Sequence, residues 1–114
     1  MKAFPIRQPR AEAIMRGVAL IEYRSRSTEV RGRIYIYANL NRYTIEQEAQ
    51  MLAMYGMADV NVDDLPRGFL LGTVELWDCT GSGGNYHWHF RNPERATELL
   101  KPTNRQHSPW FDPF

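Results

Sequence analysis

Residues 8–38, QPRAEAIMRGVALIEYRSRSTEVRGRIYIYA, give the clearest indication of the fold. The proline at position 9 suits the start of a helix, apolar residues follow at helical spacing, and Gly17 supplies a stop. Strand-forming residues then lead into a polar, arginine-rich turn, and the last six residues alternate apolar and polar side chains like a half-buried strand. We therefore expect a helix over 10–16, a strand over 18–23, a turn over 24–32 and a strand over 33–38.

The first of these strands ends in an acid and a base, Glu22 and Arg24. Because strand side chains alternate faces with a period of two, both lie on the same side. In a cleft, Arg24 could hold an anion while Glu22 accepts a hydrogen bond from an amine or a hydroxyl group. The alternative is an exposed ion pair, which would contribute only about 0–1 kcal/mol to stability.

The middle of the chain predicts a second helix. Thr44 and Gln47 form a capping-box signature, and Gly56 ends the helix. Its expected core-facing stripe consists of Ile45, Ala49, Leu52 and Ala53. A methionine-rich helix of this kind could also serve as a partner surface, but packing is the more common role.

Several short strands complete the pattern. We expect an acidic loop over 57–68, a long strand over 69–79 with a bend or bulge at Gly72, a hairpin connection over 81–85 and a strand over 86–90. Short strands around two helices, without a repeating βαβ unit, indicate an α+β fold built on a small curved sheet or barrel. Residues 1–114 are predicted to form a single domain.

The charge is unevenly distributed although the net charge is only +1. Residues 1–33 hold eight Lys and Arg against three Asp and Glu, whereas residues 34–80 hold two against seven. Twelve of the fourteen basic residues are arginines, whose planar guanidinium suits phosphate, carboxylate and base edges. The pattern predicts a local anion-binding face on a protein that is close to neutral overall.

Cellular location is predicted from the cysteine content and the hydropathy. The single cysteine, Cys79, excludes an internal disulfide and fits a reducing compartment. No apolar run approaches the length of a membrane span, and the first residues lack the apolar core of a secretory signal. We therefore expect a cytoplasmic protein that does not enter a membrane.

Three further features have chemical potential. Glu75 lies in the middle of an apolar strand, so it must face either solvent or a polar pocket. His87 and His89 share one strand face, but without further ligands at metal-binding spacing we expect no metal site and no cofactor. Trp88 and Trp110 could stack on nucleic-acid bases, although aromatic residues in a small domain often fill the core.

Ordered motifs along nearly the whole chain resemble the activating-signal-cointegrator homology (ASCH) family. They are Gln8-Pro9, Gly17, Glu22-x-Arg24, Arg31-Gly32, GTVELWDC (72–79), YHWHF (86–90) with Asn92-Pro93, and the ending PWFDPF. The resemblance implies a PUA-like fold, a small β-barrel with flanking helices and a polar cleft. It also implies an association with RNA, and a few members are hydrolases that act on RNA or on acylated cytidine nucleosides.

The cleft motif of the family, Gly-x-Lys-x-x-Glu-x-Arg, is matched only in part. Glu22 and Arg24 agree with it, but the lysine position holds Ala19. In the cytidine-amidohydrolase branch a Lys, a Thr and a Glu carry the reaction, and the matching positions here are Ala19, Glu22 and Glu75. Because alanine has no amine to act as base or nucleophile, we expect the lysine-dependent hydrolysis to be absent. Arg10 is a second departure, since many relatives carry an aromatic residue after Gln-Pro.

The resulting functional prediction is an ASCH domain that binds RNA or a modified nucleotide in a polar cleft, with no assigned catalytic residue. The ligand-binding residues that we expect are Gln8, Glu22, Arg24, Arg26 and Glu75. Arg31 and Arg33 are expected to add salt-sensitive phosphate contacts. One alternative is a small hydrolase, a ribonuclease or an acylated-cytidine amidohydrolase, that uses Glu22 with Glu75, or the two histidines. A further alternative is a protein-interaction module that uses the methionine-rich helix and the aromatic tail.

Overall fold

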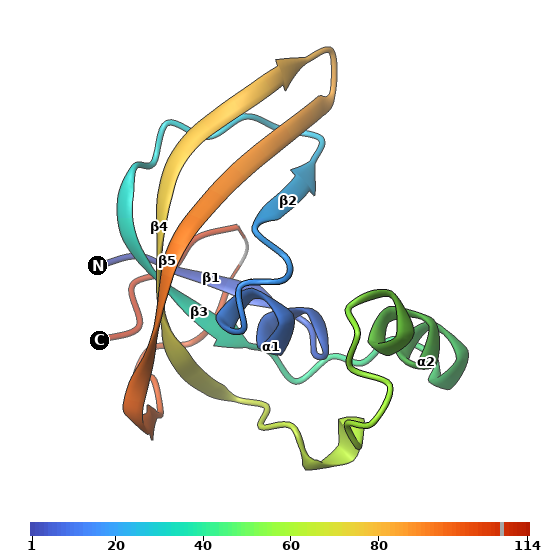
Figure 1. Ribbon diagram of the computed structural model, residues 1–114. Coiled ribbons are helices and arrows are strands. Elements are labelled where there is room, and N and C mark those ends of the chain that lie inside the picture. Colours follow the sequence, from blue (N-terminus) through green and yellow to red (C-terminus); the bar gives the residue numbers. More distant parts are fainter. Residues whose placement is uncertain (108) are drawn as a thin grey trace.

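The computed structural model describes residues 1–107 and 109–114. Its elements follow the chain in an α+β order (Figure 1): β1 (Ala3–Ile6), α1 (Arg10–Met15), β2 (Ile21–Arg24), β3 (Gly32–Ala38), α2 (Ile45–Met54), a 3-10 turn η1 (Val62–Asp64), β4 (Phe69–Ser82) and β5 (Asn85–Leu100). The predicted α+β class is confirmed. No helix in the described part of the chain is both long and apolar enough to cross a membrane.

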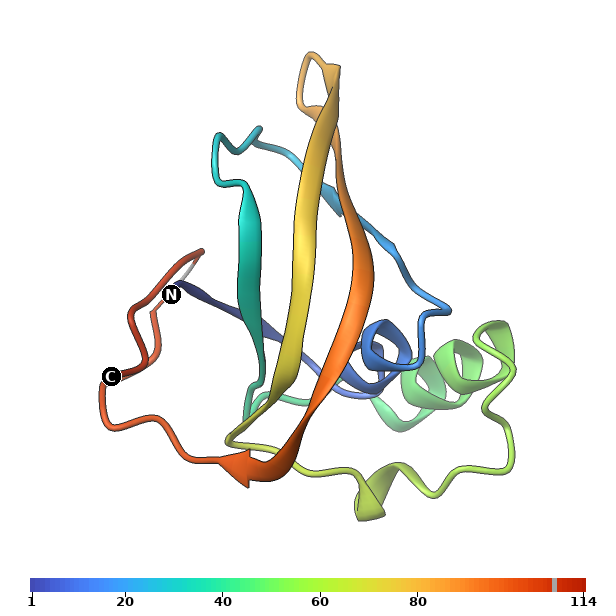
Figure 2. The same ribbon diagram turned by 60° about the vertical axis from the view of Figure 1, so that its left-hand side comes forward.

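The five strands form one mixed sheet in the order β1-β3-β4-β5-β2. β1 runs parallel to β3, and the other neighbouring strands are antiparallel. The sheet is strongly curved (Figure 2), but β1 and β2 are its two edges and do not pair with each other. The expected barrel is therefore not closed. Side chains span the space between the edges where a barrel would have backbone hydrogen bonds, since Arg24 of β2 lies 4.5 Å over the ring of Phe4 in β1.

The core fills the inner face of the curved sheet and is covered by α1. Every residue of α1 after its first is buried, and the helix packs against β3, β4 and β5. Alternation along the strands places Val74, Leu76, Trp88 and Phe90 on this inner face, each at most 2% exposed. The expected strand at 18–23 is shorter than predicted and begins at Ile21, because Val18 and Ala19 instead donate backbone hydrogen bonds to Ala13 in α1.

β4 and β5 form a long twisted ribbon. The predicted hairpin connection is confirmed: Gly83 and Gly84 both have positive φ, as tight hairpin turns require. The predicted irregularity at Gly72 is also confirmed, because the registers of both β3–β4 and β4–β5 shift beside it. β5 is much longer than the strand expected over 86–90 and includes residues 95–100, whose sequence pattern does not distinguish helix from strand.

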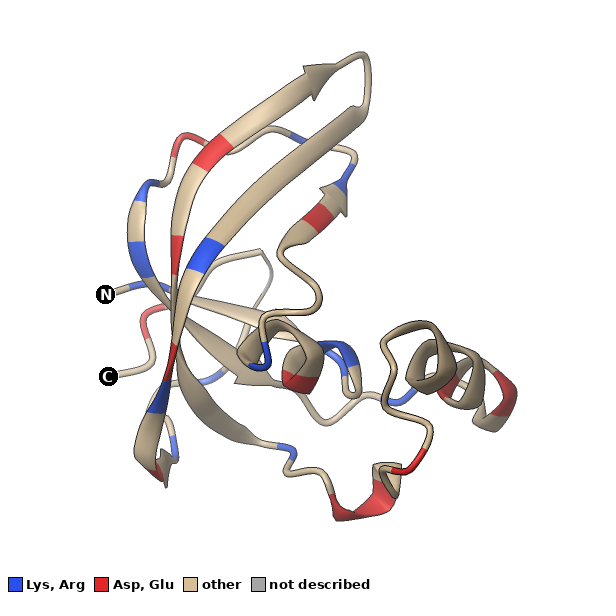
Figure 3. Ribbon diagram, in the orientation of Figure 1, with Lys and Arg blue, Asp and Glu red and all other residues tan. Residues whose placement is uncertain are grey.

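α2 has its predicted capping box but not its predicted packing. Thr44 and Gln47 satisfy each other's backbone amides, yet Ile45 is 85% exposed and Ala49 and Ala53 are exposed as well. The helix lies beside α1 and away from the sheet (Figure 1), so of the expected stripe only Leu52 is buried. Figure 3 shows that acidic residues gather on α2, on η1 and on the loop between them.

Residues 109–114 pass beside β1. Ala3 and Phe111 exchange backbone hydrogen bonds of 2.8 and 3.2 Å, and Phe111 is 1% exposed. Trp110 stacks on Trp88 with ring centroids 5.5 Å apart and nearly parallel planes. The C-terminal segment therefore lies next to the edge of the sheet that β1 forms.

Candidate functional site

A cavity of about 410 Å³ lies where the two edges of the sheet approach each other. We call it the central cavity. Its walls come from the end of β1, from α1, from β2, from the segment after β3 and from the C-terminal segment, and its lining residues are Pro5, Ile6, Arg7, Arg10, Glu22, Tyr23, Arg24, Asn39, Asn41, Tyr43 and Gln106. Three arginines therefore face one carboxylate.

Glu22 holds two of these arginines in place. Its Oε1 accepts from Nε of Arg10 at 2.6 Å, and its Oε2 accepts from Nε of Arg24 at 2.8 Å. The Glu22 side chain is only 8% exposed, so the carboxylate lies in a setting where charge pairing is strong. The predicted neighbours Glu22 and Arg24 are thus brought together in a cavity, with Glu22 as the group that orients its neighbours.

Arg24 keeps hydrogen-bonding capacity for a ligand. Its Nε is used by Glu22, and its guanidinium lies over the rings of Phe4 and Trp88 at 4.5 and 5.8 Å. In the described part of the chain no group accepts a hydrogen bond from its two terminal nitrogens. A planar guanidinium that is fixed at one end and open at the other is suited to bind a phosphate or a carbonyl group.

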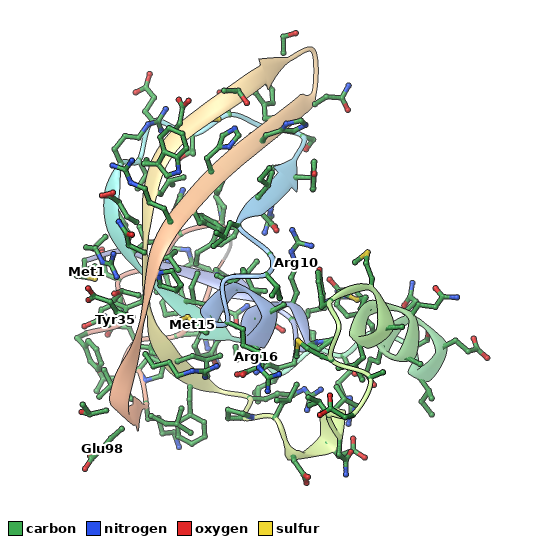
Figure 4. All side chains as sticks on the ribbon, in the orientation of Figure 1. Met1, Arg10, Met15, Arg16, Tyr35 and Glu98 are labelled. Carbon is green, nitrogen blue, oxygen red and sulfur yellow. The ribbon has the colours of Figure 1, made fainter. Side chains whose placement is uncertain are left out.

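Arg10 is one of the site residues that sequence reasoning missed. It reaches from α1 toward β2 (Figure 4), where it contacts Glu22, the hydroxyl of Tyr55 and the carbonyl of Ile21. Burial alone would lower the pKa of Arg10, but the Glu22 carboxylate and Tyr55 outweigh that effect and raise it. The sequence marks Arg10 only as a departure from the pattern that it resembles, and the spatial partner of Arg10 cannot be read from local sequence.

Arg7 and Tyr43 also form part of the cavity wall. The guanidinium of Arg7 lies 5.0 Å from the centre of the Tyr43 ring, which is a cation–π geometry. Asn39 and Asn41 add amide groups to the same wall. The cavity therefore combines excess positive charge with an aromatic side chain and neutral hydrogen-bonding groups.

Gln8 has a structural role and is not a ligand-facing residue of the cavity. It is completely buried, its Nε2 donates to the carbonyl of Pro66, and its Oε1 accepts from the backbone amide of Glu12 in α1. Gln8 thus joins the start of α1 to the segment before β4 and does not line the central cavity. It positions Arg10 by fixing the first turn of the helix.

Glu75 lies on the other face of the sheet. Its neighbours Val74 and Leu76 point into the core, and Glu75 points outward, where Nε of Arg91 donates to it at 2.6 Å. This hydrogen bond lowers the pKa of Glu75. Glu75 and Glu22 are therefore on opposite faces and are not brought together as an acid–base pair.

His87 and His89 also point away from the cavity. They alternate with the buried Trp88, and His89 Nε2 is 2.8 Å from Oγ1 of Thr80. In the described residues no group of three or more His, Cys, Asp or Glu side chains is placed to hold a metal ion.

Arg26 lines a neighbouring recess, which we call the tryptophan hollow. This recess of about 440 Å³ is bounded by Arg24, Ser25, Arg26, Ser27, Trp88, Pro109 and Trp110. The indole nitrogen of Trp88 donates to the carbonyl of Arg26 at 3.0 Å and thereby fixes the turn after β2. Arg24 belongs to both the central cavity and this hollow, so Arg24 and Arg26 are close while Gln8 and Glu75 lie elsewhere.

The family lysine position is filled by a core residue. Ala19 is 8% exposed and belongs to the hydrophobic core, outside the lining of the central cavity.

Two known proteins are similar to the chain. Human "Activating signal cointegrator 1" is 36% identical over 78 residues, and the mouse protein of the same name is 38% identical over 76 residues. These matches cover 65% and 63% of the chain but only 13% of each relative, so the chain spans a small part of their length. No protein-family model matches the chain.

Proposed function

Because this chain carries the homology sequence of the activating signal cointegrators, the ASCH sequence, we propose that it binds RNA or a modified nucleotide in the central cavity. The observation that carries the proposal is the arrangement around Glu22, which fixes Arg10 and Arg24 side by side in a cavity with a third arginine. Such a cluster attracts phosphate oxygens and holds them with charge-assisted hydrogen bonds.

The aromatic groups of the cavity favour a nucleotide over a simple anion. Tyr23 and Tyr43 line the cavity, Tyr43 lies under Arg7, and the guanidinium plane of Arg24 covers the buried rings of Phe4 and Trp88, so the lining combines aromatic rings with planar cations. Unstacked bases bind to such surfaces by stacking, while the neighbouring arginines contact the backbone. Arg24 would hold a phosphate or a base carbonyl, and Arg26 in the adjoining hollow would contact the next phosphate.

The same groups support binding without lysine-dependent hydrolysis. Guanidinium groups do not lose their protons in proteins, so Arg10 and Arg24 cannot act as general bases. Glu22 is occupied by both of them, and Ala19 supplies no amine. The single-domain organisation of residues 1–114 and the cytoplasmic location remain predictions of the sequence.

A titration of labelled single-stranded RNA at several salt concentrations, with the RNA checked for cleavage afterwards, tests this function. We expect saturable binding that weakens with salt and leaves the RNA intact, and we expect Arg24→Ala to lose most of the affinity. Arg91→Ala is the matched control, since Arg91 is an exposed arginine whose partner Glu75 is on the outer face. Unchanged binding by Arg24→Ala would place the ligand elsewhere, and cleaved RNA would favour the hydrolase instead.

A further inference from the structure

Three recesses of the molecule share lining residues and therefore adjoin. The central cavity meets the tryptophan hollow at Arg24. On its other side it meets a third recess of about 730 Å³ at Asn41 and Gln106. We call the third recess the tail hollow; it lies between the segment 67–69 that enters β4 and the segment 101–106 that follows β5. The three recesses therefore follow one another through shared lining residues, and we call them together the track.

The track has strong charge asymmetry. The tail hollow adds Arg67, Lys101 and Arg105 to the arginines of the other two recesses, so seven cationic side chains line the track. Glu22 is the one carboxylate in the lining as far as the structure describes the chain. Even when Arg67 is set aside, because its Nη2 lies 3.4 Å from Glu48, six cationic groups face one acid. No acidic residue of α2 or η1 is among the described lining residues of the track, although Glu48 of α2 pairs with Arg67.

Each recess also pairs its cations with aromatic side chains. Tyr43 lies in the central cavity, Phe69 lines the tail hollow and Trp110 lines the tryptophan hollow, and each of these three rings is partly exposed. Tyr37 and Trp88 also border the two hollows, but both are buried. A repeated pairing of cation and ring along a groove is the arrangement that binds a single strand, whose phosphates follow the charges while its bases stack. In a duplex the bases are paired inside the helix and cannot stack on aromatic rings that lie in a recess.

We propose that the track binds a single-stranded nucleic-acid segment of several nucleotides, which runs from the tryptophan hollow through the central cavity into the tail hollow. This inference rests on the proposed function and extends it, because it makes the ligand a strand longer than one nucleotide and makes Lys101 and Arg105 part of the binding surface. RNA and DNA strands share the phosphates and bases that the track would contact.

The first experiment measures affinity as a function of strand length. The probes are uridine monophosphate, a dinucleotide, and uridine and thymidine oligomers of about four and eight nucleotides, within the range that a single-strand-binding domain covers. We expect the affinity to rise through the series to the longer oligomers. Equal affinity for the mononucleotide and the octamer would overturn the track while leaving the central cavity as a nucleotide site. Weaker binding of the thymidine oligomer than of its uridine counterpart would assign the track to RNA, and equal binding would assign it to single strands of both kinds.

The second experiment tests the tail hollow with charge-matched variants. The double variant Lys101→Ala/Arg105→Ala should lower the slope of log affinity against log salt by about 1.4, because each cation that neutralises a single-strand phosphate adds about 0.7 to that slope. It should leave mononucleotide binding unchanged. Lys2→Ala/Arg91→Ala removes the same charge from the exposed pairs with Asp112 and Glu75 and should change neither value. Equal effects of the two double variants would show a nonspecific charge effect and overturn the track.

These outcomes separate the two proposals. If the unmodified protein binds no nucleic acid, or if Arg24→Ala binds with full affinity, the proposed function itself is wrong. Binding that depends on Arg24 but not on strand length or on the tail hollow contradicts only the track.

Discussion

At the scale of single residues, Glu22 decides the geometry of the central cavity. It connects Arg10 of α1 to Arg24 of β2, and it is buried while both arginines keep partial exposure. Removing one member of a buried ion pair is costly, because the partner charge remains in a poorly solvated position. Glu22 therefore supports both the fold and the orientation of the proposed binding groups.

Glu22→Gln should destabilise the protein by about 3 kcal/mol, at the low end of the range for a broken buried pair because Arg24 can reach solvent. Denaturant unfolding monitored by tryptophan fluorescence measures this change. Glu75→Gln is the control, since its pair with Arg91 is exposed and its removal should have little effect. Comparable destabilisation of the two variants would contradict the assigned role of Glu22.

Gly72 is required by close packing at the point where β4 bends. A Cβ atom at this position would lie 2.2 Å from the carbonyl oxygen of Glu94 and 2.8 Å from Cα of Arg95. Both contacts are with backbone of the paired strand, which cannot move without disturbing the sheet. The bend at Gly72 is therefore a feature that only glycine permits here.

Gly72→Ala should lower the free energy of unfolding by about 1–3 kcal/mol or more, the usual effect of overpacking. Gly83→Ala separates this steric effect from backbone strain, because Gly83 has a φ of +60° with nothing within 4 Å of the added Cβ. Thermal unfolding of the two variants gives the comparison. A smaller effect of Gly72→Ala than of Gly83→Ala would show that the strands at Gly72 can separate.

At the scale of elements, α2 shows how a helical pattern can predict the element but not its buried face. Its apolar positions repeat at helical spacing, yet the side chain that is most deeply buried in it is Glu48, at 2% exposure. The carboxylate of Glu48 accepts hydrogen bonds from the guanidinium groups of Arg42 and Arg67, and these ion pairs fix it in the first turn of α2. Buried charge is acceptable when it is paired in this way.

Leu52→Ala and Ile45→Ala form a matched test of this orientation. Leu52 is 8% exposed and its truncation should cost about 2–3 kcal/mol, as for other buried leucines. Ile45 is 85% exposed, so its truncation should change stability by less than about 0.5 kcal/mol. Chemical denaturation checks both values, and a loss for Ile45→Ala as large as that for Leu52→Ala would show that Ile45 is buried as well, as the sequence predicted.

The junction between α1 and β5 depends on Glu12. Nη1 of Arg95 and Nε of Arg16 donate to this buried carboxylate at 3.0 and 2.8 Å. Burial would raise the pKa of Glu12, but the hydrogen bonds from Arg95 and Arg16 outweigh it and lower the pKa. Its folded pKa thus lies below its unfolded value, so Glu12 stabilises the fold at neutral pH and this contribution is lost as acid protonates it.

Glu12→Gln should destabilise the protein by about 1–3 kcal/mol at pH 7, because the polar partners lose a charged acceptor. The stability of the unmodified protein should fall below about pH 4.3, the ordinary range for glutamate, and the variant should show a weaker fall there. Unfolding curves between neutral and acid pH measure both effects. Parallel pH profiles for the two proteins would assign the acid sensitivity to other carboxylates.

At the scale of the whole molecule, the C-terminal segment completes the open sheet. It contacts β1 through Phe111, stacks Trp110 on Trp88, and contributes Gln106 to the central cavity. Residues from the two ends of the sequence therefore share one binding region, although the sequence places them about a hundred positions apart.

Phe111→Ala should destabilise the protein by about 3–5 kcal/mol, as expected for a buried phenylalanine. Phe114→Ala is the control, since Phe114 is 58% exposed and its ring meets that of Tyr35 edge to face. If the segment also forms the proposed track, Phe111→Ala should weaken oligonucleotide binding under conditions where it remains folded. Calorimetry with a parallel binding titration measures both changes.

Features that depend on near neighbours could be predicted from the sequence alone. The helix after Pro9, the capping box at Thr44, the hairpin at 81–85 and the Glu22/Arg24 alternation all follow from local periodicity and local hydrogen bonding. The resemblance to the ASCH family was likewise carried by ordered local motifs.

Which face of each element lies inside was settled by the tertiary fold. The fold buries Gln8, where it joins α1 to the segment before β4, and turns Glu75 outward. It also exposes Ile45 and brings Arg10 into contact with Glu22. It also leaves the sheet open between β1 and β2, with a cavity where a closed barrel would have a seam. These outcomes depend on contacts between distant segments, and such contacts are selected by burial and charge pairing across the fold, which no local pattern contains.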